Sequence, residues 1–432
     1  MSEVKVPEGY KQTEVGVIPE DWGVSLLMDI TIDMLQGINT AIDKPEYVYV
    51  GVPILKANNV IDQVISLNDA DQISYKSYLK YNQRYSVKRN DFLFSNIGAR
   101  LGTGALWESD ITATFAWNVM RIIPDPRKVA PKFLAQLINS PKQSEKIQAQ
   151  QSGSGMGFVP KATMQKLLLP LPKLIEQTAI ATALSDVDNL IQSLEKLIAK
   201  KEAIKTGTMQ QLLTGKTRLP EFATREDGSA KGFKQTELGQ IPEDWEVKPL
   251  GDLSIQIKSG KNIKDKFGIY PLYGSTGQIG KCKIPSYNQE AILVARVGAN
   301  AGRVNFVDGK YGVSDNTIII NTNSDNSIQF VKSWLVQKDL NTLVFGSGQP
   351  LITGTQLKNL LTLAPSKNEQ IAIATTLSDM DNEIQVLQQR LEKTKDIKQG
   401  MMQQLLTGKV RLLDSSAKSD TQTLASKGEL QA

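Results

Sequence analysis

Two stretches of the sequence mix basic residues with tyrosines, a combination suited to the phosphates of nucleic acid. Residues 77–91 read SYLKYNQRYSVKRND, and residues 258–283 hold six lysines and one aspartate. Lysine and arginine bind phosphate oxygens, whereas arginine, asparagine and glutamine at turn tips suit the edges of bases. An ordinary solvated surface has a similar composition, so both interpretations stay open for any single residue of these stretches.

The residue types that carry most catalysis and metal binding are nearly absent. The sequence has no histidine and one cysteine, Cys282, which excludes Ser-His and Cys-His nucleophile pairs, cysteine-based zinc sites and an internal disulfide. Residues 212–217 (LLTGKT) look like the end of a phosphate-binding loop, but Gln210 stands where that loop needs a glycine. No Asp/Asn-Pro-Pro-aromatic motif for methylation of base amino groups occurs. We therefore expect no catalysis, cofactor or metal in this chain.

The charge pattern places the basic residues in two separate regions. The chain has 432 residues and a net charge of +5. Lysine and arginine outnumber aspartate and glutamate by 16 to 12 over residues 23–170 and by 13 to 8 over residues 246–364. The length suits two domains, and two basic regions suit a polyanionic partner. Because no run of eighteen apolar residues and no secretory signal occurs, we expect a soluble, cytoplasmic protein with no membrane partner.

Two motifs occur twice and frame these regions. Residues 9–22, GYKQTEVGVIPEDW, and 232–245, GFKQTELGQIPEDW, agree at 11 of 14 positions. Residues 176–219 and 369–412 agree at 28 of 44 positions without an insertion. The first pair is offset by 223 residues and the second by 193, so the intervening stretch is 30 residues longer in the first copy. Constant ends around unlike middles indicate one scaffold that carries two different binding surfaces.

The second motif has the periodicity of a coiled coil. Its apolar residues step by 4, 3, 4, 3 and 4 in both copies: Ile180, Leu184, Val187, Ile191, Leu194 and Ile198, and then Ile373, Leu377, Met380, Ile384, Leu387 and Leu391. This spacing predicts a helix over most of residues 176–213, roughly 57 Å long at about 1.5 Å per residue. A helix that docked only on its own domain would have little reason to keep the same face in both copies. We therefore predict that the two helices pair with each other, antiparallel, and act as a spacer.

The middle regions predict strands joined by glycine turns. Residues 91–107 and 291–307 each give an apolar strand, a turn and a second strand, with glycines at matching positions, Gly98 and Gly102 in one and Gly298 and Gly302 in the other. The polar residues 413–432 predict a disordered tail. The expected fold class is α+β, with two mixed α/β domains joined by two long helices that form an antiparallel coiled coil, and with an internal pseudo-twofold repeat.

Four motifs together are similar to those of one protein family. They are the opening motif of both halves, the helix start EQxAIAxxLSDxD, the helix end MQQLLTGKxRL, and YPLYGSTGQIG at residues 270–280. The likeness that they mark extends over nearly the whole chain, apart from the first eight residues and the tail. On these motifs the chain resembles the DNA specificity subunit of type I restriction-modification systems.

The resemblance implies a division of labour along the chain. Its parts would be target-recognition domain 1 at 1–170, a central helical repeat at 171–219, a linker with target-recognition domain 2 at 220–364, and a C-terminal helical repeat at 365–412. Each domain would read one half of a bipartite site in double-stranded DNA. The helices would set the spacing and contact two modification subunits, which would bring S-adenosylmethionine and adenine methylation. A restriction subunit could join them for cleavage.

We select candidate contact residues from the basic stretches, from the shared strand and turn, and from matched Gly-Ser-Gly loops. The candidates for DNA are Lys88, Arg89, Asn96, Arg100, Asn118 and Ser154 in the first domain, and Lys258, Lys261, Lys264, Arg296, Asn300, Arg303, Asn316, Ser347 and Gln349 in the second. The candidates for partner subunits are apolar residues of the helices, Leu184, Ile191, Leu194, Leu212, Leu377, Ile384, Leu387 and Leu405.

Two other functions fit the same sequence pattern. One is a bipartite DNA binder that works without methylation, such as a paralogue whose partner genes are lost. The other is a structural adaptor whose coiled coil joins proteins and whose middle regions bind no DNA. Salt-dependent DNA binding separates the adaptor from the DNA binders, and co-purification with an adenine methyltransferase identifies a working subunit.

Overall fold

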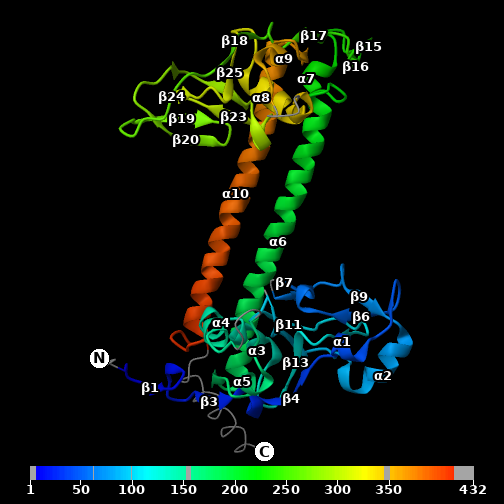
Figure 1. Ribbon diagram of the computed structural model, residues 1–432, viewed down its shortest axis with the longest axis vertical. Helices are drawn as coiled ribbons and strands as arrows, with labels where there is room; N and C mark the ends of the chain where they lie inside the picture. The colour runs from blue at the N-terminus through cyan, green and yellow to red at the C-terminus, as the bar shows by residue number, and fades with distance from the viewer. Residues whose placement is uncertain (1–5, 62, 99, 152–156, 345–350, 413–432) are drawn as a thin grey trace, which may run out of the picture. The chain divides into compact units, whose positions relative to one another are not determined.

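The structure is a computed structural model that divides into two compact units (Figure 1). Unit 1 comprises Met1–Ser193 with Leu391–Ala432, and unit 2 comprises Leu194–Arg390. Each unit therefore combines one globular part with segments of both helical repeats. The structure describes residues 6–61, 63–98, 100–151, 157–344 and 351–412. The tail predicted to be disordered lies outside these ranges.

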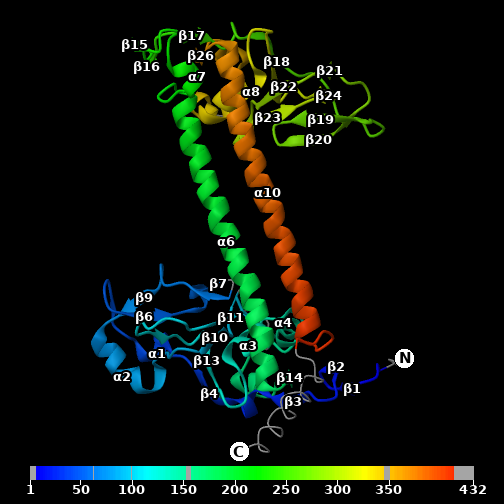
Figure 2. The same cartoon turned by 180° about the vertical axis from the view of Figure 1, so that it is seen from behind.

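Two helices of 39 residues carry the helical repeats, α6 (Leu174–Leu212) and α10 (Lys367–Leu405). They lie side by side in both views (Figures 1 and 2). Lys398 pairs with Asp188 at 2.7 Å in unit 1, and Lys201 pairs with Glu383 at 2.7 Å in unit 2. Residue numbers thus rise along one helix as they fall along the other, which confirms the predicted antiparallel pair.

Each opening motif folds as a β-hairpin that leads into a buried tryptophan. In unit 1, β1 (Tyr10–Thr13) pairs with β2 (Gly16–Pro19), and β3 (Gly23–Leu26) then pairs with β14 (Leu168–Leu171). Gly16 has a φ of +109° in the hairpin turn, a conformation that favours glycine. Pairing of β3 with β14 brings the opening motif beside the start of α6, because β14 directly precedes that helix.

Unit 2 repeats this arrangement strand for strand. Here β15 (Phe233–Thr236) pairs with β16 (Gly239–Pro242), and β17 (Glu246–Pro249) pairs with β26 (Leu361–Ala364). Because β26 directly precedes α10, the second opening motif lies beside the start of the second helix.

A hydrogen-bonded network around two buried side chains, which we call the unit 1 clamp, ties the opening motif to both helices of its unit. It consists of Trp22, Glu176, Arg411 and Asp21. The indole Nε1 of Trp22 donates to Glu176 at the start of α6 at 3.1 Å. Arg411, just beyond the end of α10, donates to Glu176 at 2.5 Å and to Asp21 at 2.9 Å. The first opening motif is therefore fastened to the end of the second copy's helix.

The unit 2 clamp has the same chemistry with the copies exchanged. It consists of Trp245, Glu369, Arg218 and Asp244. Trp245 Nε1 donates to Glu369 at 3.0 Å, and Arg218, which follows the end of α6, donates to Glu369 at 2.8 Å and to Asp244 at 2.7 Å. Each clamp thus needs the helix end of the other copy.

The globular part of unit 1 has two four-stranded sheets. The antiparallel central sheet has the order β11-β10-β13-β4, with β4 (Thr31–Gln36), β10 (Phe92–Ser95), β11 (Gly104–Leu106) and β13 (Val119–Pro124). The second sheet has the order β12-β6-β9-β5, with β5 (Tyr47–Val48), β6 (Val52–Leu55), β9 (Asp71–Ile73) and β12 (Thr114–Phe115). The other strands are the small hairpin β7 (Val60–Ile61) and β8 (Val64–Ile65). The helices are the α-helices α1 (Thr40–Asp43), α2 (Tyr75–Tyr85), α3 (Pro131–Ile138), α4 (Pro141–Gln148) and α5 (Lys161–Gln165), and the 3-10 helices η1 (Leu27–Ile30) and η2 (Ala57–Asn59).

The globular part of unit 2 has the same two-sheet plan. Its central sheet has the order β18-β25-β22-β23, with β18 (Ser254–Ser259), β22 (Ala291–Ala295), β23 (Val304–Val307) and β25 (Thr317–Thr322). The second sheet has the order β20-β19-β24-β21, with β19 (Tyr270–Gly274), β20 (Gly277–Cys282), β21 (Tyr287–Asn288) and β24 (Lys310–Val313). Its helices are α7 (Pro220–Ala223), α8 (Ile328–Gln337) and α9 (Gly354–Lys358).

The predicted strand, turn and strand are present in both units, as β10 with β11 and as β22 with β23. In each central sheet the first of these strands is flanked by two partners, so its side chains are buried. The predicted α+β class, with two mixed domains and a pair of long helices, is confirmed.

Candidate nucleic-acid interface

The register of the central sheet in unit 2 brings three chain segments to one sheet end. Ala295 at the end of β22 is opposite Thr317 at the start of β25, and Ser259 at the end of β18 is opposite Ile318. Residues just beyond these pairs therefore gather at the same end. They include three of the predicted DNA contacts, Lys261, Arg296 and Asn316.

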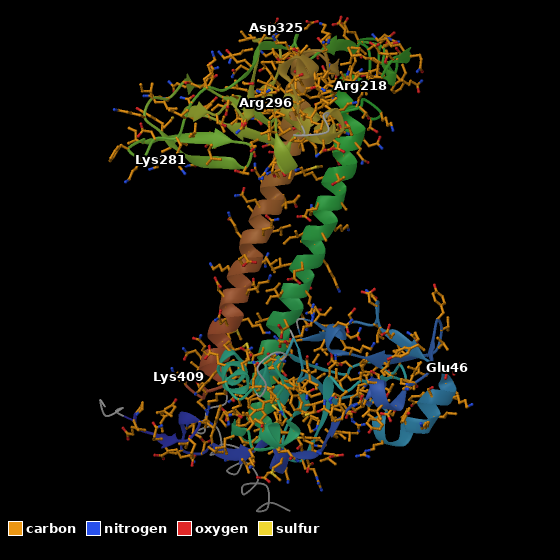
Figure 3. All side chains as sticks on the ribbon, in the orientation of Figure 1. Glu46, Arg218, Lys281, Arg296, Asp325 and Lys409 are labelled. Atoms are coloured by element: carbon orange, nitrogen blue, oxygen red, sulfur yellow. The ribbon has the colours of Figure 1, made fainter. Side chains whose placement is uncertain are left out.

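Neutral groups orient the side chain of Arg296. Its Nη1 donates to the hydroxyl of Ser259 at 3.0 Å and to the carbonyl of Asp315 at 3.4 Å. None of the described carboxylates forms an ion pair with it, and Figure 3 shows its position in unit 2. The Nε of Arg296 is buried without a hydrogen-bond partner, so the guanidinium keeps its charge and leaves Nη2 as the donor for a ligand. Arg296 therefore has the geometry of an oriented but unsatisfied donor.

Unit 1 fills the same position with a closed amide pair, which corrects one prediction. Asn96 follows β10 as Arg296 follows β22, but its side chain is fully buried. Asn96 and Gln36 exchange two hydrogen bonds of 3.0 Å, and Asn96 also donates to the carbonyl of Val159 at 3.2 Å. Every polar group of this side chain is engaged inside the protein, so the prediction that Asn96 contacts DNA is wrong.

The turn before β13 supplies the exposed side chains at this end of unit 1. Asn118 is half-buried, and its Oδ1 accepts a hydrogen bond from the Ala57 N–H at 3.3 Å. Its neighbour Trp117 is 45% exposed. In the register of the two central sheets, Trp117 corresponds to Asp315 of unit 2. The sequence analysis missed Trp117 and also the partner positions Gln36 and Ser259. The offset between those two is 223, the same as between the opening motifs, and that signal could have identified them.

The glycine turns present three further candidates. Gly98 and Gly102 have φ values of +91° and +94°, and the matching glycines of unit 2 have similarly positive values. The turns are thereby fixed, with Arg100 exposed in unit 1 and Arg303 exposed in unit 2. Asn300 is half-buried, and its carbonyl accepts a hydrogen bond from the Arg303 N–H at 2.9 Å. None of the described carboxylates pairs with either arginine.

The loop after α2 carries Lys88 and Arg89, and a buried ion pair between Asp91 and Arg121 holds this loop in place. Arg121 Nε lies 3.0 Å from Asp91, and Asp91 accepts the Lys88 N–H at 2.7 Å. Burial raises the pKa of Asp91 even though Arg121 lies beside it. Lys88 is exposed, whereas Arg89 is held by Asp110 at 2.9 Å. Lys88 is thus the freer of the two cations.

Two lysine candidates of unit 2 lie against other side chains while their ammonium groups face solvent. The ammonium of Lys258 is 5.9 Å from the ring centre of Tyr287. The stem of Lys264 covers Gly280, where a Cβ atom would be only 2.8 Å from it. Both lysines are exposed. Their placement suits phosphate contacts, in which a flexible stem packs and the charge stays outside.

The structure also corrects the predicted partner contacts on the helices. Six of the eight are buried within the chain itself: Leu184, Leu194, Leu212, Leu377, Ile384 and Leu405. The other two, Ile191 and Leu387, are half-buried. Leu184 and Leu405 belong to the core of unit 1, Leu212 and Leu377 belong to the core of unit 2, and Leu194 and Ile384 are buried along the helices. Because these side chains are buried within the chain, they were assigned to the wrong surface. The a/d pattern thus identified the buried face of each helix, which packs on the globular cores as well as along the helix pair and leaves the outer faces for partners.

The candidates Ser154, Ser347 and Gln349 lie outside the described residues. Among the residues that the structure does describe, no group of three or more His, Cys, Asp or Glu side chains could hold a metal ion. No helix in the same ranges combines the length and the apolar character needed to cross a membrane.

Comparison with known proteins gives a consistent family. The model of the type I restriction modification DNA specificity domain matches residues 19–205 and 242–395. The type I restriction enzyme MjaVIII specificity subunit of Methanocaldococcus jannaschii is 27% identical, over 94% of this chain and 96% of its own length. The type I restriction enzyme StySPI specificity subunit of Salmonella potsdam is 23% identical, over 88% and 84% respectively.

Solved structures agree in fold. The S subunit of a type I restriction-modification system from M. genitalium aligns with a TM-score of 0.59 and 16% identity, over 93% of this chain and 98% of that one. A chain from a structural study of complex assembly and conformational transition of the type I R-M system aligns with a TM-score of 0.55 and 15% identity, over 91% and 99%.

Proposed function

Because the chain belongs to the type I restriction-modification DNA specificity family, we propose that its two units each read one half of a split DNA site. The protein is the specificity subunit of such a system, which recognises DNA sequence and leaves catalysis to other subunits. Its partners are DNA and other subunits of the system. The proposal concerns how the recognition and the assembly are divided over this chain.

One observation carries the division into two readers. Both units have the same sheet end and the same glycine turn, but the side chains at matched positions differ: Arg296 where unit 1 has Asn96, and Arg303 where it has Thr103. An arginine without a carboxylate partner can bind the two acceptors of a guanine edge, and it can also bind phosphate. Two frames with unlike donors support two half-sites of different sequence.

We assign contacts in two groups, following the kind of side chain. Arg296, Arg303, Asn316 and Asn300 of unit 2, and Arg100 and Asn118 of unit 1, are the proposed contacts near base edges. The proposed phosphate contacts are the lysines Lys88, Lys258, Lys261 and Lys264. Arg89 joins the second group only if it leaves Asp110.

The helices support a role in assembly through residues on their outer faces. Leu190, Leu197 and Ile204 recur every seven residues along α6 and are each about two-fifths exposed. On α10, Val386 and Ile397 are 62% and 49% exposed. Apolar residues of this kind in a solvated helix suit a protein partner. We propose that modification subunits bind here, one to each copy of the repeat, and that they bring S-adenosylmethionine. A restriction subunit would add cleavage.

The proposed domain boundaries follow the sequence repeats. Residues 1–170 and 220–364 would hold the two recognition domains, with helical repeats at 171–219 and 365–412. A cytoplasmic location stays part of the proposal.

A map of N6-methyladenine in the host genome tests the function directly. It would be recorded with the gene intact, with the gene deleted, and with the deletion complemented by the Arg296→Ala variant. We expect deletion to remove methylation from one split motif, two short halves around a fixed gap. We expect the variant to lose or relax only one half. A map unchanged by deletion would refute the modifying function and leave the orphan binder and the adaptor as the remaining possibilities.

A further inference from the structure

The second sheet of unit 2 and the loop before it form a surface that the phosphate contacts assigned to Lys261 and Lys264 explain only in part. We call residues 261–288 the lysine lobe. It holds five exposed lysines, Lys261, Lys264, Lys266, Lys281 and Lys283, and one acidic residue, Asp265. None of the five forms an ion pair with a carboxylate that the structure describes. Figure 3 labels Lys281 on this lobe. A lobe with this charge suits a polyanion.

An exposed phenylalanine stands among these lysines. Phe267 is 83% exposed, and its neighbours Ile263, Ile269 and Ile284 are 81%, 70% and 73% exposed. Single exposed apolar residues are ordinary, but an aromatic ring with this exposure next to Lys266 is not part of any core. The lobe thus combines exposed apolar side chains with exposed lysines.

A rigid turn holds Phe267 in this position. The Asp265 N–H donates to the carbonyl of Lys281 on β20 at 2.9 Å, which ties the turn to the sheet. Asp265 in turn accepts the Phe267 N–H on its side chain at 2.8 Å and the Gly268 N–H on its carbonyl at 3.2 Å. Gly268 lies so close to the backbone of Cys282 that a Cβ atom would be 2.6 Å from it. The ring therefore projects from a turn that is fixed before any ligand binds.

Unit 1 has an exposed aromatic residue and a closely packed glycine in the matching place. In each second sheet one strand pairs in parallel with the strand that leads into the central sheet: β6 with β12, and β19 with β24. Just before β6 stands Tyr49, 99% exposed, and then Gly51, where a Cβ atom would be 2.2 Å from the carbonyl of Ile73. An exposed aromatic residue followed by a closely packed glycine therefore precedes the same strand in both units, although the surrounding sequences differ.

We propose that Phe267 is an apolar wedge that inserts between stacked base pairs of the bound DNA, and that Tyr49 is its counterpart in unit 1. This rests on the proposed function in one respect only, that the chain binds double-stranded DNA. Proteins that distort DNA insert Phe, Leu or Ile side chains at a base step while nearby cations hold the phosphates. The fixed turn supplies the rigidity that such insertion needs, and the five lysines supply the cations. Unstacking depends on base sequence, so the wedge would add specificity without a hydrogen bond to a base.

Fluorescence of 2-aminopurine tests the wedge, since this base brightens when it is unstacked. The full-length chain, purified with the subunits that accompany it, would be added to duplexes of the site found by the methylation map. The probe would replace each adenine in the half-site of unit 2 and in its flanks. The proteins to compare are wild type, Phe267→Ala, Phe267→Leu and Ile255→Ala. Ile255 is 75% exposed on β18, away from the turn, and serves as the matched control.

We expect one probe position to brighten with wild type, Phe267→Leu and Ile255→Ala, and to stay dark with Phe267→Ala. The alanine variant should bind the site roughly tenfold more weakly, by analogy with lost base stacking. If wild type binds the site but no position brightens, or if Phe267→Ala brightens it equally, the wedge is refuted and the proposed function stands. If wild type shows no site-specific binding, the proposed function fails, and the wedge fails with it.

Discussion

Replacing Arg411 with alanine should destabilise unit 1 by about 2 to 3 kcal/mol. Glu176, its main partner, is 3% exposed, and without Arg411 the carboxylate would keep only the hydrogen bond from Trp22. Removing one partner of a fully buried ion pair costs about 3 to 5 kcal/mol, because the other charge stays buried. The side chain of Arg411 is itself 27% exposed, so water can replace part of what is lost, and we place the effect below that range.

The twin residue in unit 2 gives an internal comparison. Arg218 is 6% exposed and its partner Glu369 is 1% exposed, so Arg218→Ala should cost about 3 to 5 kcal/mol. Lys248→Ala serves as the control, because Lys248 pairs with Glu246 on an exposed strand where an ion pair contributes ~0 to 1 kcal/mol. The loss of unfolding free energy should therefore be largest for Arg218→Ala, smaller for Arg411→Ala and smallest for Lys248→Ala.

Hydrogen exchange detected by mass spectrometry is the suitable assay, because it reports each unit separately. Amides of residues 9–22 should lose protection in Arg411→Ala, and those of residues 232–245 in Arg218→Ala. A rescue variant sharpens the test. Adding Glu176→Gln to Arg411→Ala removes the unpaired charge, so the double variant should be more stable than Arg411→Ala alone. The reasoning fails if protection in both single variants stays within about 0.5 kcal/mol of wild type, or if the second substitution gives no recovery.

Three further predictions concern the two proposed interfaces and the pH dependence of the unit 1 clamp. Arg296→Ala should lower affinity for the cognate DNA site by more than about tenfold and relax the sequence preference at one half-site, because a bidentate contact contributes ~1 to 3 kcal/mol. Competition binding measures both effects. Unchanged affinity and unchanged preference would remove Arg296 from the set of DNA contacts. Leu197→Asp with Ile204→Asp should abolish co-purification of the methyltransferase while DNA binding by the chain persists; retention of the methyltransferase would place docking elsewhere. The hydrogen bond from Arg411 lowers the pKa of Asp21 in the folded protein. The stabilisation that this pair gives the fold is therefore complete above the pKa of Asp in the unfolded chain, about 3.9, and is lost as the pH falls through the lower pKa of the folded state. Protection of residues 9–22 against exchange should therefore decline below about pH 4 in wild type, and it should decline less steeply in Arg411→Ala. Equal slopes of protection against pH in the two proteins would exclude the Asp21–Arg411 pair as the cause.

The helices and the strand-turn-strand units were predictable because their signals are local. A heptad repeat that occurs twice leaves few alternatives to a helix, and two apolar runs on either side of the turn at Gly98 and Gly102 predict a hairpin directly. The burial of Asn96 was not predictable from its surroundings, because its partner Gln36 lies 60 residues earlier in the chain. At this sheet end, unit 1 has the hydrogen-bonded amides of Asn96 and Gln36, whereas unit 2 has Arg296 and Ser259. In each unit the two side chains are far apart in the sequence.

The exchange of helix ends explains why the ends of the two copies stay alike while their middles differ. Each clamp takes its tryptophan and glutamate from one copy and its arginine from the other. A change in the opening motif of one copy must therefore remain compatible with the helix end of the other copy. The same holds in the opposite direction, because the two clamps exchange their helix ends. Identical clamps meet this condition in both units at once. The central sheets and the lysine lobe take no part in either clamp, so their side chains can change to fit new DNA sequences without disturbing the frame that holds them.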